Sequence, residues 1–183
     1  MSPPRRDPAS PGQRLESFAW VGDPAARVLL LGSMPGVASL AAQRYYAHPR
    51  NAFWPIMGAL FAAGPELAYA ERLERLRRAG VALWDVVHRC RRSGSLDAAI
   101  ASESVEPNDF AALFAACPRI HSVFFNGGTA RLLYRRHVLP SATGRVRALA
   151  LVTLPSTSPA HAALGFADKL ARWRQVAQAA ARG

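Results

Sequence analysis

Four short apolar runs, each followed by a polar or glycine-rich turn, constrain the fold of this chain most strongly. They cover residues 28–31, 81–87, 122–125 and 147–154. The first run, Val28–Leu31, shows no polar and apolar alternation, which is typical of a strand buried on both faces of a parallel sheet. Helical patterns separate the runs. This order predicts an α/β fold, a three-layer α/β/α sandwich around a central, mainly parallel four-stranded sheet.

The predicted connections between the strands follow from apolar spacing. Helices are expected near residues 53–60, 67–76, 110–117 and 129–137 and in the last segment of the chain. Pro107-Asn108 can cap the third of them. The last helix should bury Phe166 and Trp173 and leave Lys169 on its polar side. Residues 88–97 are rich in arginine and lack an apolar period, so an irregular segment is predicted there.

The length of 183 residues suits one domain with a full core, and 50% of the residues are apolar. Residues 1–13 contain four prolines and three charges and little that is apolar. We expect them to form a flexible tail rich in proline and arginine. Residues 14–183 are expected to form the single domain.

The charge balance favours a polyanionic partner, because the formal net charge is +11 and the pI is about 11.2. Cys90 and Cys117 are too few and too far apart for a zinc site or an iron–sulfur cluster, so no metal or other cofactor is expected. Both are expected to be buried, reduced thiols. Without a signal-peptide core or a membrane-spanning run, we expect a monomer in the cytosol or nucleoid with no membrane partner.

The turn Gly32-Ser33-Met34-Pro35-Gly36 follows the first strand directly. Open α/β sheets bind ligands at the carboxyl ends of their strands, so this turn marks a candidate site. Beyond it, residues 45–54 crowd aromatic rings, an arginine, a histidine and a carboxamide into one segment. Such a segment suits a pocket wall.

These two segments, with His48-Pro49-Arg50-Asn51-Ala52-Phe53-Trp54 as the second, resemble the first motif of the uracil-DNA glycosylase superfamily. Their form and spacing are similar to those of the mismatch-specific uracil-DNA glycosylases. The third turn residue, an Asn or Asp that handles the attacking water in most branches, is Met34 here, and a thioether cannot do this work. That difference, with a retained Asn51, resembles the hypoxanthine-DNA (deoxyinosine) glycosylases. The superfamily's three-layer fold agrees with the fold predicted above.

The resemblance implies roles for the residues at the strand ends. Asn51 is expected to hold the water, although it can equally cap the helix that follows. Tyr46 is expected to stack on the extruded base, with a core tyrosine as the alternative. The remaining base-binding candidates are Gly32, Ser33, Met34, Phe53, Asp85 and Asn126. Asp85 can accept N1–H of a purine or, if protonated, donate toward N7, and Asn126 can instead simply end its strand.

A second segment, Pro155-Ser156-Thr157-Ser158-Pro159-Ala160-His161, resembles the last motif of the superfamily. That loop grips the DNA backbone and leads into a wedge that enters the base stack. Pro155, Ser156, Thr157 and Ser158 are therefore candidate phosphate contacts. Ala160 occupies the wedge position, where its small side chain argues against strong intercalation. His161 can donate to the departing base or to a phosphate, or can be structural.

The predicted function is that of a monofunctional DNA glycosylase. It would hydrolyse the N-glycosidic bond of a deaminated base, hypoxanthine first and uracil second, flipped out of double-stranded or single-stranded DNA. The product is an abasic site in base excision repair. A lyase needs an amine for a Schiff base, and Lys169 is not expected at the site. The alternatives are a catalytically silent damaged-DNA-binding module and a serine hydrolase built on Ser33, His161 and Asp85.

Overall fold

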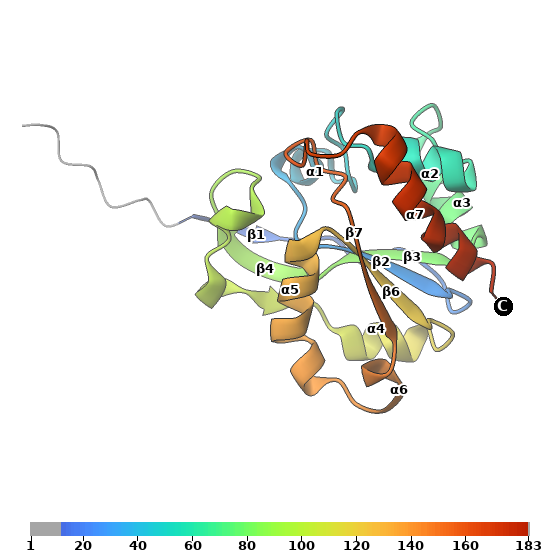
Figure 1. Cartoon of the computed structure of the whole chain (residues 1–183). Coiled ribbons are helices and arrows are strands. Elements are labelled where there is room, and N and C mark those ends of the chain that lie inside the picture. Colours follow the sequence, from blue (N-terminus) through green and yellow to red (C-terminus); the bar gives the residue numbers. More distant parts are fainter. Residues whose placement is uncertain (1–11, 183) are drawn as a thin grey trace, which may run out of the picture.

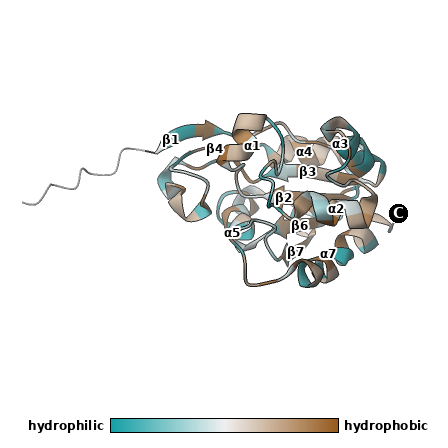
Figure 2. Cartoon of the chain, turned by 90° about the horizontal axis from the view of Figure 1, so that it is seen from above, coloured by the Kyte–Doolittle hydropathy of each residue, from teal (hydrophilic) through white to brown (hydrophobic). Residues whose placement is uncertain are grey.

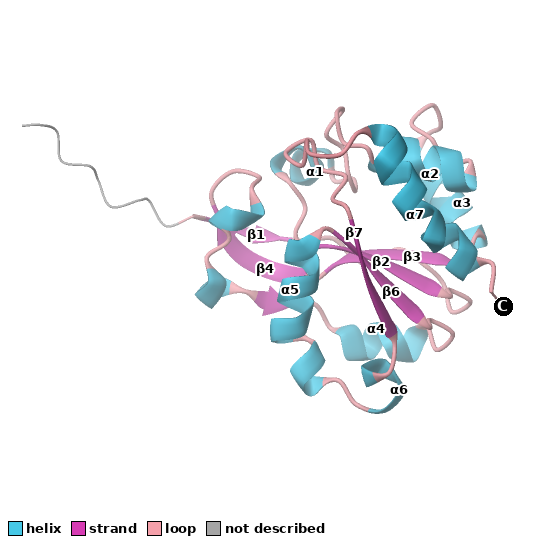
Figure 3. Cartoon of the chain, viewed as in Figure 1, coloured by secondary structure: helices cyan, strands magenta, loops and turns pink. Residues whose placement is uncertain are grey.

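The computed structural model describes residues 12–182, and a parallel four-stranded sheet lies at its centre (Figure 1). The strand order is β3-β2-β6-β7. These strands are β2 (Val28–Gly32), β3 (Val81–Asp85), β6 (Ser122–Asn126) and β7 (Ala150–Leu154). Helices cover both faces of the sheet, as Figure 3 shows. The predicted α/β/α fold class is confirmed.

The side chains of β2 alternate between two separate cores, because successive residues of a strand point to opposite faces. Val28 and Leu30 pack in one core, and Leu29 and Leu31 pack in the other. The first core is completed by α2 (Phe53–Phe61), α3 (Tyr69–Arg78) and α7 (Phe166–Ala180). The second is completed by α4 (Phe110–Ala116) and α5 (Gly128–His137). Both faces of the strand are therefore dry, which explains its unbroken apolar run.

The outward side of α3 carries the ion pairs Glu71–Arg75 and Glu74–Arg78, at 3.0 and 2.8 Å. The helix accordingly shows as hydrophilic in Figure 2. Both pairs have the i,i+4 spacing that stabilises an exposed helix.

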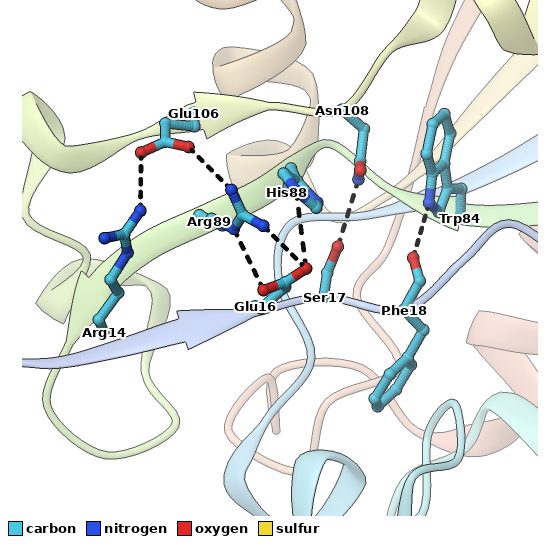
Figure 4. Close-up of polar contacts among 9 residues, drawn as sticks. All are labelled: Arg14, Glu16, Ser17, Phe18, Trp84, His88, Arg89, Glu106 and Asn108. Carbon is cyan, nitrogen blue, oxygen red and sulfur yellow. Dashed lines mark hydrogen bonds and ion pairs between the residues drawn. The ribbon is translucent and has the colours of Figure 1, made fainter.

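A second sheet includes the first half of the segment that was predicted to be irregular, whereas residues 93–96 form no helix or strand. β4 (Val87–Arg92) pairs antiparallel with β1 (Gln13–Glu16) and with β5 (Glu106–Pro107). The prediction was wrong for residues 88–92 because this stretch has no apolar period, and its strand is held by pairing with β1 and β5 and by ion pairs of Arg89 with those strands. Arg89 contacts Glu16 at 3.1 Å and Glu106 at 3.9 Å, and Arg14 contacts Glu106 at 3.5 Å (Figure 4).

Several boundaries differ from the sequence prediction. Arg147 ends the short helix α6 (Gly144–Arg147), and β7 begins only at Ala150. Asp109, rather than Asn108, caps α4 by accepting from Ala112 N. On α7, Phe166 is exposed and Lys169 is buried, the reverse of the prediction. The predicted tail lies outside the described residues up to residue 11, whereas Gln13 begins β1.

The carboxyl ends of the parallel strands lie side by side. Gly32 pairs with Asp85, and Asn126 pairs with Leu154. From β2 the chain passes to β3 on one side, and then returns across β2 to β6 on the other. This reversal of direction creates the crevice in which open α/β sheets bind ligands. Within residues 12–182, no helix has the length and apolar character needed to cross a membrane.

Candidate active site

A cavity of about 330 Å³ lies at this edge of the sheet, within the typical size range of small-molecule sites. It is lined by the turn after β2, the segment after α1 (Val37–Ala42), the ends of β3 and β6, and the last-motif loop. The predicted site residues that line it are Gly32, Ser33, Met34, Tyr46, Asn51, Asp85, Asn126, Ser156, Thr157, Ser158, Ala160 and His161. Segments more than a hundred residues apart thus meet at one cavity.

The turn after β2 is held by backbone hydrogen bonds and by the buried guanidinium of Arg92. Val86 N donates to Gly32 O at 2.9 Å, and Val87 N donates to Ser33 O at 3.0 Å. Arg92 is 1% exposed and donates to the carbonyls of Gly94, Met34 and Pro35. A guanidinium has five donors in a rigid fork, so it can satisfy several carbonyls at once. The shape of the turn depends on this contact.

Asp85 forms the floor of the cavity. Its side chain passes under Gly32, where an added Cβ would lie 2.5 Å from Asp85 Oδ1 and 3.1 Å from the Tyr46 hydroxyl. The carboxyl is buried, and its Oδ2 has no hydrogen-bond partner within residues 12–182. Burial, with a contribution from the charge of Asp97 and against that of Arg92, raises the pKa of Asp85 from 3.8 to about 8. At pH 7 this carboxyl is therefore neutral, with one donor and one acceptor.

Tyr46 forms the wall beside Asp85. Its ring stacks on Phe53 with centroids 3.9 Å apart and planes 20° apart. The residue has a φ of 54°, a left-handed conformation that is strained for a tyrosine. Its hydroxyl is buried without a partner among the described residues, and burial raises its pKa. Tyr46 is thus fixed by packing rather than by hydrogen bonds, with one ring face covered by Phe53.

Phe53 is corrected from a base-binding residue to a support for Tyr46. Its side chain is fully buried and does not line the cavity, because it begins α2 and points into the first core. Tyr46 lines the cavity and Phe53 stacks on it without lining the cavity.

Asn51 makes the capping contact considered for it, and it also lies at the cavity. Its Oδ1 accepts from Phe53 N at 3.0 Å, which caps the first turn of α2. The residue also lines the cavity, and its Nδ2 makes no hydrogen bond within residues 12–182. Because a carboxamide oxygen has two lone pairs, capping leaves one acceptor and the NH₂ donors free for a water molecule.

The last-motif loop is clamped to the end of β6. Asn126 donates through Nδ2 to Thr157 Oγ1, and its Oδ1 accepts from Thr157 N, both at 2.8 Å. Thr157 O in turn accepts from Ala52 N at 3.0 Å, next to Asn51. The clamp therefore joins β6, the last motif and the start of α2.

This clamp corrects two predicted roles. Thr157 is 1% exposed, so its hydroxyl cannot reach a DNA phosphate. Pro155 does not line the cavity, and its carbonyl accepts from Trp173 Nε1. Ser156 and Ser158 each accept a backbone N–H two residues later, and both line the cavity. His161 lines it too, and its carbonyl accepts from Lys169 Nζ at 2.8 Å.

Sequence reasoning missed one wall of the cavity, formed by Ser95, Leu96 and Asp97. Ser33 Oγ lies 2.7 Å from both carboxylate oxygens of Asp97, to which it donates. Val37 N donates to Ser95 Oγ at 2.9 Å. The signal in the sequence was an acid and two serines beside a glycine, directly after a strand. Ser33 is thus paired with a carboxylate and not with His161, which removes the arrangement that a serine hydrolase needs.

The described residues offer no group of three or more His, Cys, Asp or Glu side chains placed to hold a metal ion. The polar groups that line the cavity are carboxyls, hydroxyls, carboxamides and two imidazoles.

Comparison with known proteins gives consistent similarities. A sequence profile described as the uracil DNA glycosylase superfamily matches residues 19–178. A Methanosarcina acetivorans protein named hypoxanthine DNA glycosylase is 34% identical over 139 residues, covering 71% of this chain and 87% of that protein. A Methanosarcina barkeri protein of the same name is 36% identical over 113 residues, covering 61% and 70%.

The fold is similar to a solution NMR structure from Methanosarcina acetivorans, described as a candidate uracil DNA glycosylase. The TM-score is 0.71 and the sequence identity 30%. The match covers 90% of this chain and 99% of that one.

Proposed function

The chain belongs to the uracil DNA glycosylase superfamily, and from this premise we propose that it is a monofunctional DNA glycosylase. It acts as a cytoplasmic monomer on DNA that contains a deaminated base, hypoxanthine first and uracil second, and leaves an abasic site for base excision repair. The relatives named hypoxanthine DNA glycosylase support the order of substrates. The observation that carries the proposal is the meeting at one cavity of Tyr46, Asn51 and the Asp85 carboxyl, whose Oδ2 has no hydrogen-bond partner within residues 12–182.

Asp85 suits the edge that deamination creates. Deamination leaves a lactam, with an N–H donor beside a carbonyl acceptor, at N1 and O6 of hypoxanthine and at N3 and O4 of uracil. A neutral carboxyl offers the complementary pair, because its O–H donates and its C=O accepts. The raised pKa of Asp85, about 8, keeps this form at pH 7. A carboxylic acid held neutral by its site can thus bind the base through two hydrogen bonds.

Tyr46 provides the stacking surface for the same base. Flipping a nucleotide out of a duplex costs a few kcal/mol of stacking and pairing. Stacking on an aromatic side chain returns roughly 1–3 kcal/mol per base. Since Phe53 already covers one ring face, only the other face of Tyr46 is open to the base.

Asn51 provides the position for water. In the reaction the bond from C1′ to the base nitrogen breaks, and its electron pair leaves with the base. A water oxygen bonds to C1′, and its proton passes to solvent or to the base. The carboxamide is too weak a base to take this proton early. It can hold the water beside C1′ while the positive charge develops on the sugar.

The chain's single lysine supports the absence of lyase activity. Lys169 does not line the cavity, and its Nζ donates to the His161 carbonyl. A Schiff base with the sugar needs a free amine at C1′. Strand scission should therefore require added alkali.

The direct test is single-turnover incubation with duplexes that carry deoxyinosine, deoxyuridine, xanthine or ethenocytosine, each with and without alkaline treatment. We expect deoxyinosine to be cleaved fastest and deoxyuridine second, and only after alkali. Tight binding to these duplexes with no base release would overturn the proposal. It would instead establish the catalytically silent damaged-DNA-binding module. The reason to consider that module is the buried Met34, which stands where most branches of the superfamily have an Asn or Asp.

A further inference from the structure

Two exposed apolar residues lie at the cavity or next to it: Leu96 lines it, and Val37 lies in the chain between the lining residues Gly36 and Ala38. Leu96 is 61% exposed although it also lines the cavity, and Val37 is 52% exposed at the start of α1. The hydrogen bond from Val37 N to Ser95 Oγ places the two residues on adjoining segments. Single exposed hydrophobic residues are common and need no explanation. This pair does require an explanation, because of its position and because of the hydrogen bonds that hold its segments.

The loop that carries Leu96 is fastened on both sides. Before Leu96, Gly94 O accepts from Arg92 Nε at 2.9 Å, and Ser95 Oγ accepts from Val37 N. After it, Asp97 accepts from Ser33 Oγ, and Asp97 O accepts from Ile100 N at 3.0 Å. These bonds tie the loop to the same turn that lies over Asp85. Leu96 is therefore presented to the outside from a supported position.

A glycosylase that flips a nucleotide leaves a hole in the base stack. Proteins that deform DNA fill such gaps with apolar side chains, leucine among them, inserted between base steps. The last motif offers only Ala160 for this purpose, and its methyl group is too short to span a base step. Leu96 lies at the same cavity, on the loop that follows β4.

We propose that Leu96 is the side chain that enters the base stack of duplex DNA, with Val37 beside it as apolar support. The net charge of +11 favours association of the chain with a duplex. This inference rests on the proposed function, since a wedge has a role only where a nucleotide is flipped. Single-stranded DNA has no pairing partner to be displaced and does not need the wedge.

The experiment compares Leu96→Ala with Leu132→Ala under single-turnover conditions. Leu132 is the matched control, since it is 66% exposed on α5 and does not line the cavity. Each variant is assayed on duplex and on single-stranded oligonucleotides that carry deoxyinosine. For Leu96→Ala, we expect the ratio of duplex to single-strand rate to fall at least about tenfold, given the unstacking energy that a wedge offsets. Leu96→Met should restore the ratio, and Leu132→Ala should leave it at the wild-type value.

Base flipping is followed separately by the fluorescence of 2-aminopurine placed next to the lesion. Leu96→Ala should reduce the rise in fluorescence on binding. An unchanged rate ratio together with an unchanged fluorescence rise would overturn the wedge while leaving the glycosylase proposal intact. A wild-type protein that releases no base would overturn the glycosylase proposal, and the fluorescence of the two variants would still decide on the wedge.

Discussion

Replacing Asp85 by asparagine should stabilise the protein by an amount that grows with pH. The folded protein holds the Asp85 proton up to a pKa of about 8, whereas the carboxyl otherwise titrates near 3.8. Between these values the folded state binds one proton more than the unfolded state. The free energy of unfolding of the wild type should therefore fall by roughly 1.4 kcal/mol per pH unit as pH rises through this window. Below the window, where both states are protonated, the loss is absent.

The asparagine side chain has nearly the same shape as that of aspartate and cannot ionise. The difference in unfolding free energy between Asp85→Asn and the wild type should rise from its value near pH 4 by on the order of 5 kcal/mol at pH 8, and then level off. Urea unfolding at one-unit pH steps measures this difference. Asp168→Asn, at an exposed position on α7, controls for the loss of one carboxylate. Parallel stability curves for Asp85→Asn and the wild type would refute the assignment of a neutral, buried Asp85.

Three further substitutions test the packing of the site. Gly32→Ala should lower the free energy of unfolding by about 1–3 kcal/mol, because its Cβ would lie 2.5 Å from Asp85 Oδ1. Gly128→Ala is the control, since the added Cβ would meet nothing within 4 Å, and it should leave the free energy of unfolding unchanged. Thermal melts compare the two variants. Tyr46→Ala should weaken binding of deoxyinosine DNA by roughly 1–3 kcal/mol in titrations, while Tyr46→Phe keeps the ring and should bind as the wild type does. Arg92→Lys should destabilise by roughly 1–3 kcal/mol or more in urea, because an ammonium cannot replace the fork to Gly94, Met34 and Pro35 and leaves buried carbonyls unpaired. Equal effects of Arg92→Lys and the exposed Arg91→Lys would contradict this reasoning.

The central sheet could be predicted from the sequence because its strands are buried on both faces. The runs that form β2, β3 and β6 are apolar at nearly every position. Each run is about five residues long and is followed by a turn, which is too short for a buried helix. β4 could not be predicted in the same way. Its Arg89 is stabilised by Glu16 and Glu106, which are distant in sequence, so no local pattern marks it as a strand (Figure 4).

The residues of the site also fall into those that local sequence predicts and those that it does not. The turn at Gly32 and the segment around Asn51 have local sequence patterns that can be recognised without knowing the fold. The wall with Leu96 and Asp97 depends on how the second sheet meets the first, and the sequence does not show that meeting. Phe53 and Thr157 were predicted to contact the base and a phosphate, but both side chains are buried. A motif shows which residues lie near a site and not which way each side chain points.

The most direct measurement of the central claim is the single-turnover rate of base release from a deoxyinosine duplex by Asn51→Ala, alongside its affinity for the same duplex. Loss of a positioned catalytic group should reduce the rate by roughly 10²-fold or more, with the dissociation constant nearly unchanged. A thermal melt accounts for the lost cap at Phe53 N. A wild-type rate in a folded Asn51→Ala protein would contradict the claim that this carboxamide holds the hydrolytic water.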